Sequence, residues 1–83
     1  MYYVYILKCG DNLFYTGYTK NLRRRFTEHY LGKSKSTRYR QPVKLVYYEA
    51  YLSSKDARRR EDMLKLHKKG FSMLKKRITH SLL

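Results

Sequence analysis

The pattern of apolar and polar positions predicts two short strands at the start of the chain. Residues 2–8 and 13–19 are each rich in aromatic and β-branched side chains, a composition typical of strands. The residues between them, Cys9-Gly10-Asp11-Asn12, are mostly turn formers. We therefore expect the two segments to pair as an antiparallel hairpin.

The next segment predicts a helix followed by a loop. Helical spacing favours a helix over about 21–31, with Asn21, or Thr19 before it, as the N-cap. Gly32 suits the C-terminal stop of this helix. Residues 33–42 are polar and basic and end in a proline, which predicts a loop.

The second half of the chain predicts one strand and two helices. Residues 43–52 have strand composition, residues 54–69 form a helix that Gly70 closes, and residues 71–81 form a last short helix. The order strand, strand, helix, strand, helix, helix is typical of an α/β fold. We expect a small three-stranded antiparallel-type sheet flanked by helices.

The charge balance indicates a polyanionic partner. Twenty Lys and Arg stand against six Asp and Glu, which gives a net charge of +14 on 83 residues. Such self-repulsion destabilises a compact state, and nucleic acid is the usual reason to tolerate it. No segment pairs a basic face with a strongly apolar face, and no apolar run of about 18 residues occurs, so we expect neither a membrane-surface helix nor a span.

Length and cysteine usage limit the organisation. A chain of 83 residues has room for one core, so we expect a single domain over residues 1–83. The opening residues 1–8 are too short and too aromatic for a secretion signal, and we expect them to form the first strand. Cys9 is the only cysteine, which excludes an internal disulfide, favours a buried hydrophobic role and fits a reducing, cytoplasmic compartment.

The first predicted helix opens with three arginines, residues 23–25. Cations in a first turn oppose the helix macrodipole, and such violations tend to mark functional sites. Arg25 and His29 are four residues apart, on a stripe that adjoins the expected inward face of Leu22, Phe26 and Tyr30. This places a guanidinium and an imidazole at the rim of the core. The alternative is a solvated arginine and an ordinary surface or boundary histidine.

The second predicted helix carries a carboxylate beside its apolar stripe. Glu61 shares this stripe with Ala57 and Leu64, and a carboxylate there needs a partner because desolvating it unpaired is costly. The partner is either a neighbouring arginine or a metal ion. One carboxylate suits Mg²⁺, which keeps several waters and takes its other ligands from phosphate oxygens. No pair of acidic residues has the spacing of a two-metal site.

Taken singly, the hairpin tyrosines are packing residues, but the combined pattern resembles the GIY-YIG nuclease superfamily. Its Gly-Ile-Tyr and Tyr-Ile-Gly signatures resemble Tyr3-Val4-Tyr5 and Tyr15-Thr16-Gly17. A third family segment resembles Thr19-Lys20-Asn21-Leu22-Arg23-Arg24-Arg25-Phe26-Thr27-Glu28-His29, and the family's metal-binding helix resembles Asp56-Ala57-Arg58-Arg59-Arg60-Glu61. The resemblance covers residues 2–78 and is closest to small single-domain bacterial members related to the N-terminal domain of a DNA-repair excinuclease.

The resemblance implies a metal-dependent endonuclease that hydrolyses DNA to a 5′-phosphate and a 3′-hydroxyl, with repair or recombination as its setting. Arg25 would be the catalytic arginine and His29 its associated histidine, while Glu61 would hold Mg²⁺ or Mn²⁺. The general base would be Tyr5 or Tyr15, with its pKa lowered by nearby cations. The first-signature glycine is Tyr3 here, the middle residue of the second is Thr16, and no asparagine follows Asn21, although larger family members often carry a later one.

The remaining basic residues are expected to contact phosphates of double-stranded or branched DNA without reading its sequence. They are Lys33, Lys35, Arg38 and Arg40 in the loop and residues 58–60 and 68–69 in the helices. Because no separate reader module is present, we expect structure-selective or weakly specific cutting, or recruitment by another protein. The rival hypotheses are a non-catalytic nucleic-acid-binding domain that keeps the fold, and a small ribosome-associated RNA-binding protein.

Overall fold

The computed structural model describes residues 1–83 as a three-stranded antiparallel sheet with helices on both faces. In chain order the elements are β1 (Tyr2–Lys8), β2 (Phe14–Thr19), α1 (Leu22–Tyr30), β3 (Lys44–Tyr51), α2 (Ser54–Leu66), α3 (Lys68–Arg77) and a 3₁₀ turn (Thr79–Leu82). The sheet order is β2-β1-β3, so β1 is central and β2 and β3 are edges. The predicted fold class and hairpin are confirmed. No helix is both long and apolar enough to cross a bilayer.

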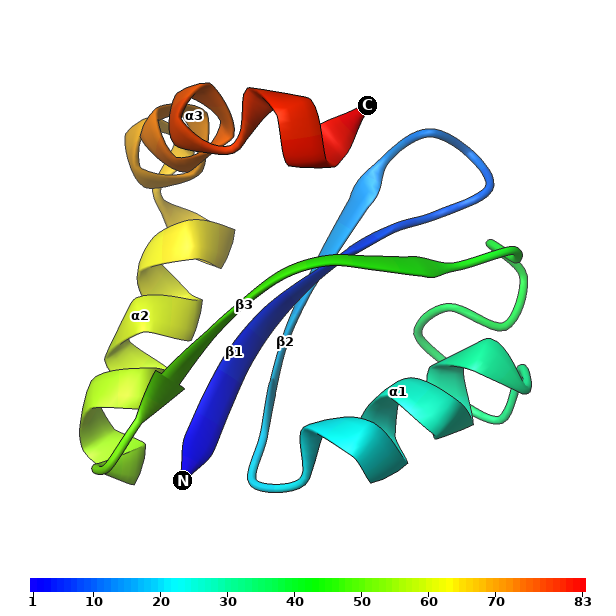
Figure 1. Ribbon diagram of the computed structural model, residues 1–83, viewed down its shortest axis with the longest axis horizontal. Helices are drawn as coiled ribbons and strands as arrows, with labels where there is room; N and C mark the ends of the chain where they lie inside the picture. The colour runs from blue at the N-terminus through cyan, green and yellow to red at the C-terminus, as the bar shows by residue number, and fades with distance from the viewer.

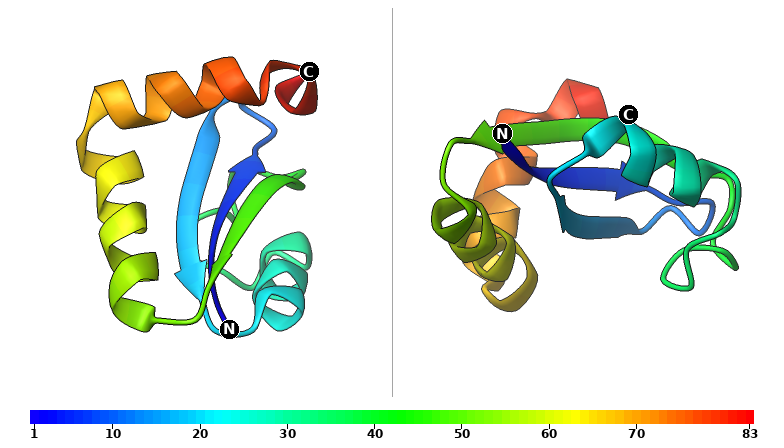
Figure 2. Two further views of the ribbon diagram at one scale, coloured as in Figure 1. Left: turned by 60° about the vertical axis from the view of Figure 1, so that its left-hand side comes forward. Right: turned by 90° about the horizontal axis from the view of Figure 1, so that it is seen from below.

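The alternation of side chains along β1 divides the core into two layers. Val4 and Ile6 point to one face, where α2 and α3 cover them, and Tyr5 and Leu7 point to the other face, where α1 lies. Figures 1 and 2 show α1 on one side of the strands and the α2–α3 pair on the other. Cys9 is buried in the α1 layer as a free thiol, which confirms its predicted packing role.

The start and end of α1 agree with the prediction from the sequence, but the residues on its inward face differ from it. Asn21 caps the helix by accepting a hydrogen bond from the Arg24 backbone N–H, and Gly32 follows the last turn with a positive φ of 75°. Tyr30, however, is 63% exposed, and His29 is fully buried in its place. The prediction that Tyr30 lies on the inward face of the helix was therefore wrong, and so was the prediction that His29 lies at the rim of the core. The reason is that the buried end of Tyr5 needs a polar partner, which the imidazole supplies.

The boundary between the last two helices also differs from the prediction. The helix expected over 54–69 ends at Leu66, and α3 has already begun when the chain reaches Gly70. The extended backbone of His67 makes the turn between the two helices, and this turn lets Leu64 and Leu74 both pack on the sheet. A single helix through this point would carry the later leucine away from the core. The 71–81 segment accordingly becomes the end of α3 followed by a 3₁₀ turn.

Arg60, one of the predicted phosphate-contact residues, links α2 to β3 through an ion pair with Glu49. Its guanidinium donates from Nε to Glu49 Oε1 at 2.9 Å and from Nη2 to Glu49 Oε2 at 3.0 Å. The hydroxyls of Tyr47 and Tyr51 donate to the same carboxylate. This arrangement satisfies a half-buried charge and fixes the helix turn that carries the neighbouring Glu61.

Candidate active site

The site is built where the side chain of Tyr5 crosses the edge strand. In the register of the hairpin Tyr5 lies opposite Gly17 and Leu7 opposite Tyr15, so these side chains share the α1 face of the sheet. A Cβ placed on Gly17 would overlap Cζ and Oη of Tyr5. The missing side chain at residue 17 therefore lets the phenol of the central strand reach the open β2 edge.

A chain of buried hydrogen bonds holds the Tyr5 hydroxyl. It lies 2.8 Å from Nε2 of His29, whose Nδ1 lies 2.7 Å from Oγ1 of Thr37. The Arg25 guanidinium lies close to the same phenol. If the phenol donates to Nε2, the neutral imidazole carries its hydrogen on Nδ1 and donates it to Thr37.

Burial keeps both Tyr5 and His29 neutral near pH 7. It raises the pKa of Tyr5 to about 12, with the nearby Tyr15 adding to the effect, although Arg25 acts in the opposite direction. Burial, helped by the Arg25 charge, lowers the pKa of His29 to about 4. For Tyr5 the expected lowering by nearby cations is therefore wrong, because desolvation of the phenolate outweighs them.

Arg25 is oriented by two polar neighbours. Its Nη1 donates to Glu28 Oε1 at 2.9 Å and its Nη2 donates to Ser34 Oγ at 3.1 Å. The hydrogen bond from Arg25 lowers the pKa of Glu28, so this carboxylate stays ionised as a counterion. The guanidinium, which is partly exposed, is thus held between Tyr5 and solvent, where it can meet an anion.

Glu61 reaches the same edge from the opposite face of the sheet. Its Oε2 lies 2.9 Å from Nζ of Lys65, and this ammonium also lies 5.8 Å from the ring centroid of Tyr15. The Glu61 charge acts on the Tyr5 hydroxyl and raises the pKa of Tyr5. Glu61 therefore lies near the hairpin tyrosines, and its protein partner is a lysine rather than the neighbouring arginine considered from the sequence.

The structure brings together the five residues predicted from sequence: Tyr5, Tyr15, Arg25, His29 and Glu61. The ring centroids of Tyr15 and His29 are 5.2 Å apart, and those of Tyr5 and Tyr15 are 6.3 Å apart. Sequence reasoning missed Thr37, which orients the imidazole, and Lys65, which neutralises Glu61. The i, i+4 spacing of Glu61 and Lys65 was a usable signal, whereas the loop position of Thr37 gave none.

The predicted phosphate-binding residues that follow have three kinds of environment. Lys33, Lys35 and Arg59 are exposed. Arg38 and Arg58 stack over the rings of Tyr39 and Tyr18 at 4.9 and 4.5 Å, which leaves their N–H groups available. Arg40 donates to Asp11 at 2.8 Å and also lines a groove beside Tyr15.

His29 makes the stability of the protein depend on pH. Its folded-state pKa of about 4 is below the ordinary value of 6.5, so the unfolded chain takes up a proton first as the pH falls. We expect full stability above pH 6.5 and a loss of about 2 kcal/mol in the free energy of unfolding between pH 7 and pH 5. Urea denaturation at intervals across this range measures it.

The control for this effect is His29→Gln, which keeps polar atoms at the site but does not titrate. Its free energy of unfolding should be lower at pH 7 and nearly constant down to pH 5. Equal pH slopes for the two proteins would assign the effect to other groups.

Comparison with known proteins gives matches over nearly the whole chain. The family model described as the GIY-YIG catalytic domain matches residues 1–77. A UPF0213 protein of Staphylococcus haemolyticus is 51% identical over 65 residues, which are 77% of this chain and 79% of the relative. A UPF0213 protein of Streptococcus pyogenes is 43% identical over 79 residues, or 94% and 86% of the two chains. The solution NMR structure of the UPF0213 protein BH0048 from Bacillus halodurans has a TM-score of 0.57 and 43% identity, and the match covers 89% of this chain and 82% of that one.

Proposed function

This chain belongs to the GIY-YIG family, whose catalytic domain implies a nuclease-type function, and on that premise we propose that it is a metal-dependent DNA endonuclease. The convergence of Arg25, the Tyr5–His29 pair and Glu61 at one open sheet edge supports this proposal above all. Each supplies one requirement of phosphodiester hydrolysis: a planar cation for the phosphate, a route for the proton of the attacking water, and a carboxylate for a metal ion.

Arg25 would bind the scissile phosphate. Its guanidinium presents several N–H donors in a plane, and this geometry matches two phosphate oxygens better than an ammonium does. As water attacks phosphorus in line, negative charge grows on the non-bridging oxygens, and a donor already fixed by Glu28 and Ser34 stabilises this charge without reorganising. The 3′ oxygen leaves, which yields a 5′-phosphate and a 3′-hydroxyl.

Tyr5 would pass the proton of the attacking water to His29. A phenol that donates its proton to Nε2 keeps lone pairs on its oxygen, so Tyr5 can take a proton from water while its own proton moves to Nε2. A concerted transfer of this kind requires no free phenolate, which suits a tyrosine whose pKa is about 12. Tyr15, whose ring faces both the imidazole and Lys65, would line the path of the water.

The residues at this edge fit a single hard cation. No three His, Cys, Asp or Glu side chains gather to form a complete metal cage. Glu61 nevertheless offers a carboxylate whose side chain is only 18% exposed and whose present counterion is the ammonium of Lys65. One carboxylate, waters and substrate phosphate suit Mg²⁺ or Mn²⁺, and such an ion would supply charge stabilisation at the leaving oxygen.

The proposed substrate is double-stranded or branched DNA, cut with structure selectivity or weak sequence preference. The net charge of +14 provides non-specific affinity for phosphates, and a recruiting protein would direct the enzyme to DNA in repair or recombination. The buried free Cys9 fits activity in the reducing cytoplasm. A non-catalytic binding domain would explain the charge but would not need the Tyr5–His29–Thr37 chain.

Arg25→Lys tests the proposal while preserving charge. The purified protein is incubated with plain, nicked and branched DNA in Mg²⁺, Mn²⁺ or EDTA, and products are resolved on denaturing gels. We expect metal-dependent cutting by the wild type and a loss of about a hundredfold or more in the variant, because a point charge replaces paired donors. DNA affinity should change by less than about twofold, since the charge that sets it is kept. Metal-independent cutting, or none on any DNA, contradicts the proposal.

A further inference from the structure

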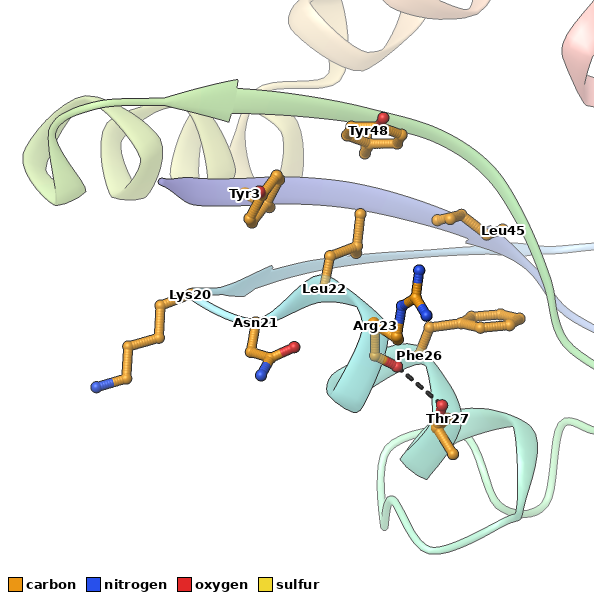
Figure 3. A pocket seen from close by; sticks show the side chains of 9 residues that line it. All are labelled: Tyr3, Lys20, Asn21, Leu22, Arg23, Phe26, Thr27, Leu45 and Tyr48. Atoms are coloured by element: carbon orange, nitrogen blue, oxygen red, sulfur yellow. Dashed lines mark hydrogen bonds between the residues drawn. The ribbon is translucent and has the colours of Figure 1, made fainter.

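A second groove lies on the α1 face of the sheet, on the side away from Glu61. It has a volume of about 450 Å³ and runs between α1 and the β1–β3 pair. Figure 3 shows Tyr3 and Tyr48 projecting from β1 and β3 toward Leu22 on the helix, with Lys20 and Asn21 at one end. Neither the Tyr5–His29 pair nor Glu61 lines it, so the proposed reaction leaves it without a role.

The aromatic wall of this groove is open to solvent. The rings of Tyr3 and Tyr48 meet edge to face with centroids 6.1 Å apart, and Tyr48 is 54% exposed. Its neighbours on β3 are different, since Tyr47 and Tyr51 pack against the α2 layer and donate to Glu49. More than half of the Tyr48 side chain is therefore open to solvent and outside the core, where it is available for stacking.

The charge of the groove is entirely positive. Lys20 and Arg23 line it, and no acidic residue does. The four ion pairs of the protein all lie elsewhere, on Arg25, Arg40, Arg60 and Lys65. Lys20 and Arg23 consequently have no internal counterion. A basic rim around exposed aromatic rings is the arrangement that binds single-stranded nucleic acid, because bases stack on the rings while cations meet the phosphates.

The position of α1 connects this groove to the site at the β2 edge. Arg25 projects from one side of the helix toward Tyr5, and Arg23 and Phe26 line the groove on the other side. A strand whose phosphate meets Arg25 can continue over the basic start of α1. Bases within a duplex are already stacked and paired, so only an unpaired base is free to lie on Tyr48.

We propose that the groove between α1 and β3 is a subsite for an unpaired nucleotide of the DNA, stacked on Tyr48 with its phosphates on Lys20 and Arg23. The continuation of the DNA strand from Arg25 into this groove rests on the proposed function. Binding of an unpaired nucleotide in the groove does not. The subsite would make the protein prefer DNA with a single-stranded segment next to the bond at the β2 edge.

The test measures binding in EDTA, where no cutting occurs. Fluorescence anisotropy is recorded with a labelled dT oligonucleotide, with a strand of abasic residues of equal length, and with a blunt duplex. We expect Tyr48→Ala to weaken dT binding by about tenfold or more and to change abasic-strand and duplex binding by less than about twofold. Tyr48→Phe should bind dT nearly as the wild type does, and so should Tyr30→Ala, which removes an exposed ring outside the groove.

Equal losses on dT, abasic and duplex DNA, or no loss on dT, would overturn the subsite. Circular dichroism of Tyr48→Ala verifies that the fold is retained. The two proposals fail separately. If the wild type never cuts DNA but Tyr48→Ala loses only dT binding, the proposed subsite is supported and the proposed nuclease activity is contradicted. If cutting is metal-dependent and Tyr48→Ala binds dT as the wild type does, the proposed nuclease activity is supported and the proposed subsite is contradicted.

Discussion

Glu61→Gln is expected to abolish cutting while leaving folding and DNA binding intact. The charge of Glu61 acts on Tyr5, and an amide cannot hold a hard cation as the carboxylate does. A metal ion contributes several kcal/mol of transition-state stabilisation, so its loss lowers the cleavage rate by about a thousandfold or more. Glu61 and Lys65 form an i, i+4 helix pair whose lysine is 42% exposed, and such a pair is worth only about 0.5 kcal/mol, so the thermal midpoint should barely move.

The matched control for this change is Asp62→Asn. Asp62 is the next residue on α2 and is exposed, so its substitution alters the net charge equally without touching the site. We expect wild-type cutting from Asp62→Asn. Mn²⁺ binding, followed by electron paramagnetic resonance with a non-cleavable DNA analogue, should be lost in Glu61→Gln and kept in Asp62→Asn. Wild-type rates in Glu61→Gln would remove the metal from the mechanism.

The parts of the site that sequence predicted correctly are those set by short-range periodicity. Two-residue alternation along β1 places Tyr5 with Leu7 on one face, whereas the register that puts Gly17 opposite Tyr5 is known only from the structure. His29 was misplaced although a signal existed. It follows Leu22 by seven residues and Phe26 by three, which is the spacing of one helix face. Its polar side chain argued against burial, and the hydrogen bonds to Tyr5 and Thr37 explain why burial is tolerated.

Other features depend on contacts between distant segments and leave no local pattern. Ser34 and Thr37 are buried in a basic loop because they hydrogen-bond Arg25 and His29, which no periodicity predicts. The break between α2 and α3 at His67 has no side-chain cap. It is decided by the packing of Leu64 and Leu74 in the core on that face of the sheet, whereas the local glycine signal pointed three residues too far along.

Gly17→Ala should damage both the stability and the activity of the protein, although it adds one methyl group. The new Cβ would overlap Cζ and Oη of Tyr5. The ring is fully buried and hydrogen-bonded to His29, so it cannot turn aside freely. Overpacking of this kind costs about 1–3 kcal/mol, which urea denaturation measures. Because the displaced phenol would lose its path from water to His29, we expect cutting to fall by about tenfold or more in an assay below the unfolding midpoint.

A double-mutant cycle with Tyr5→Leu separates the clash from a general intolerance of side chains in β2. Leucine lacks the ring atoms that the new Cβ would meet, so Gly17→Ala should cost less than about 0.5 kcal/mol in the Tyr5→Leu background, a non-additivity typical of neighbours that compete for the same space. The double variant should therefore be nearly as stable as Tyr5→Leu alone, yet remain unable to cut, since the hydroxyl is absent. If the two substitutions are additive, Gly17 is not required for the passage of the Tyr5 ring, and the β2 edge is held open by other means.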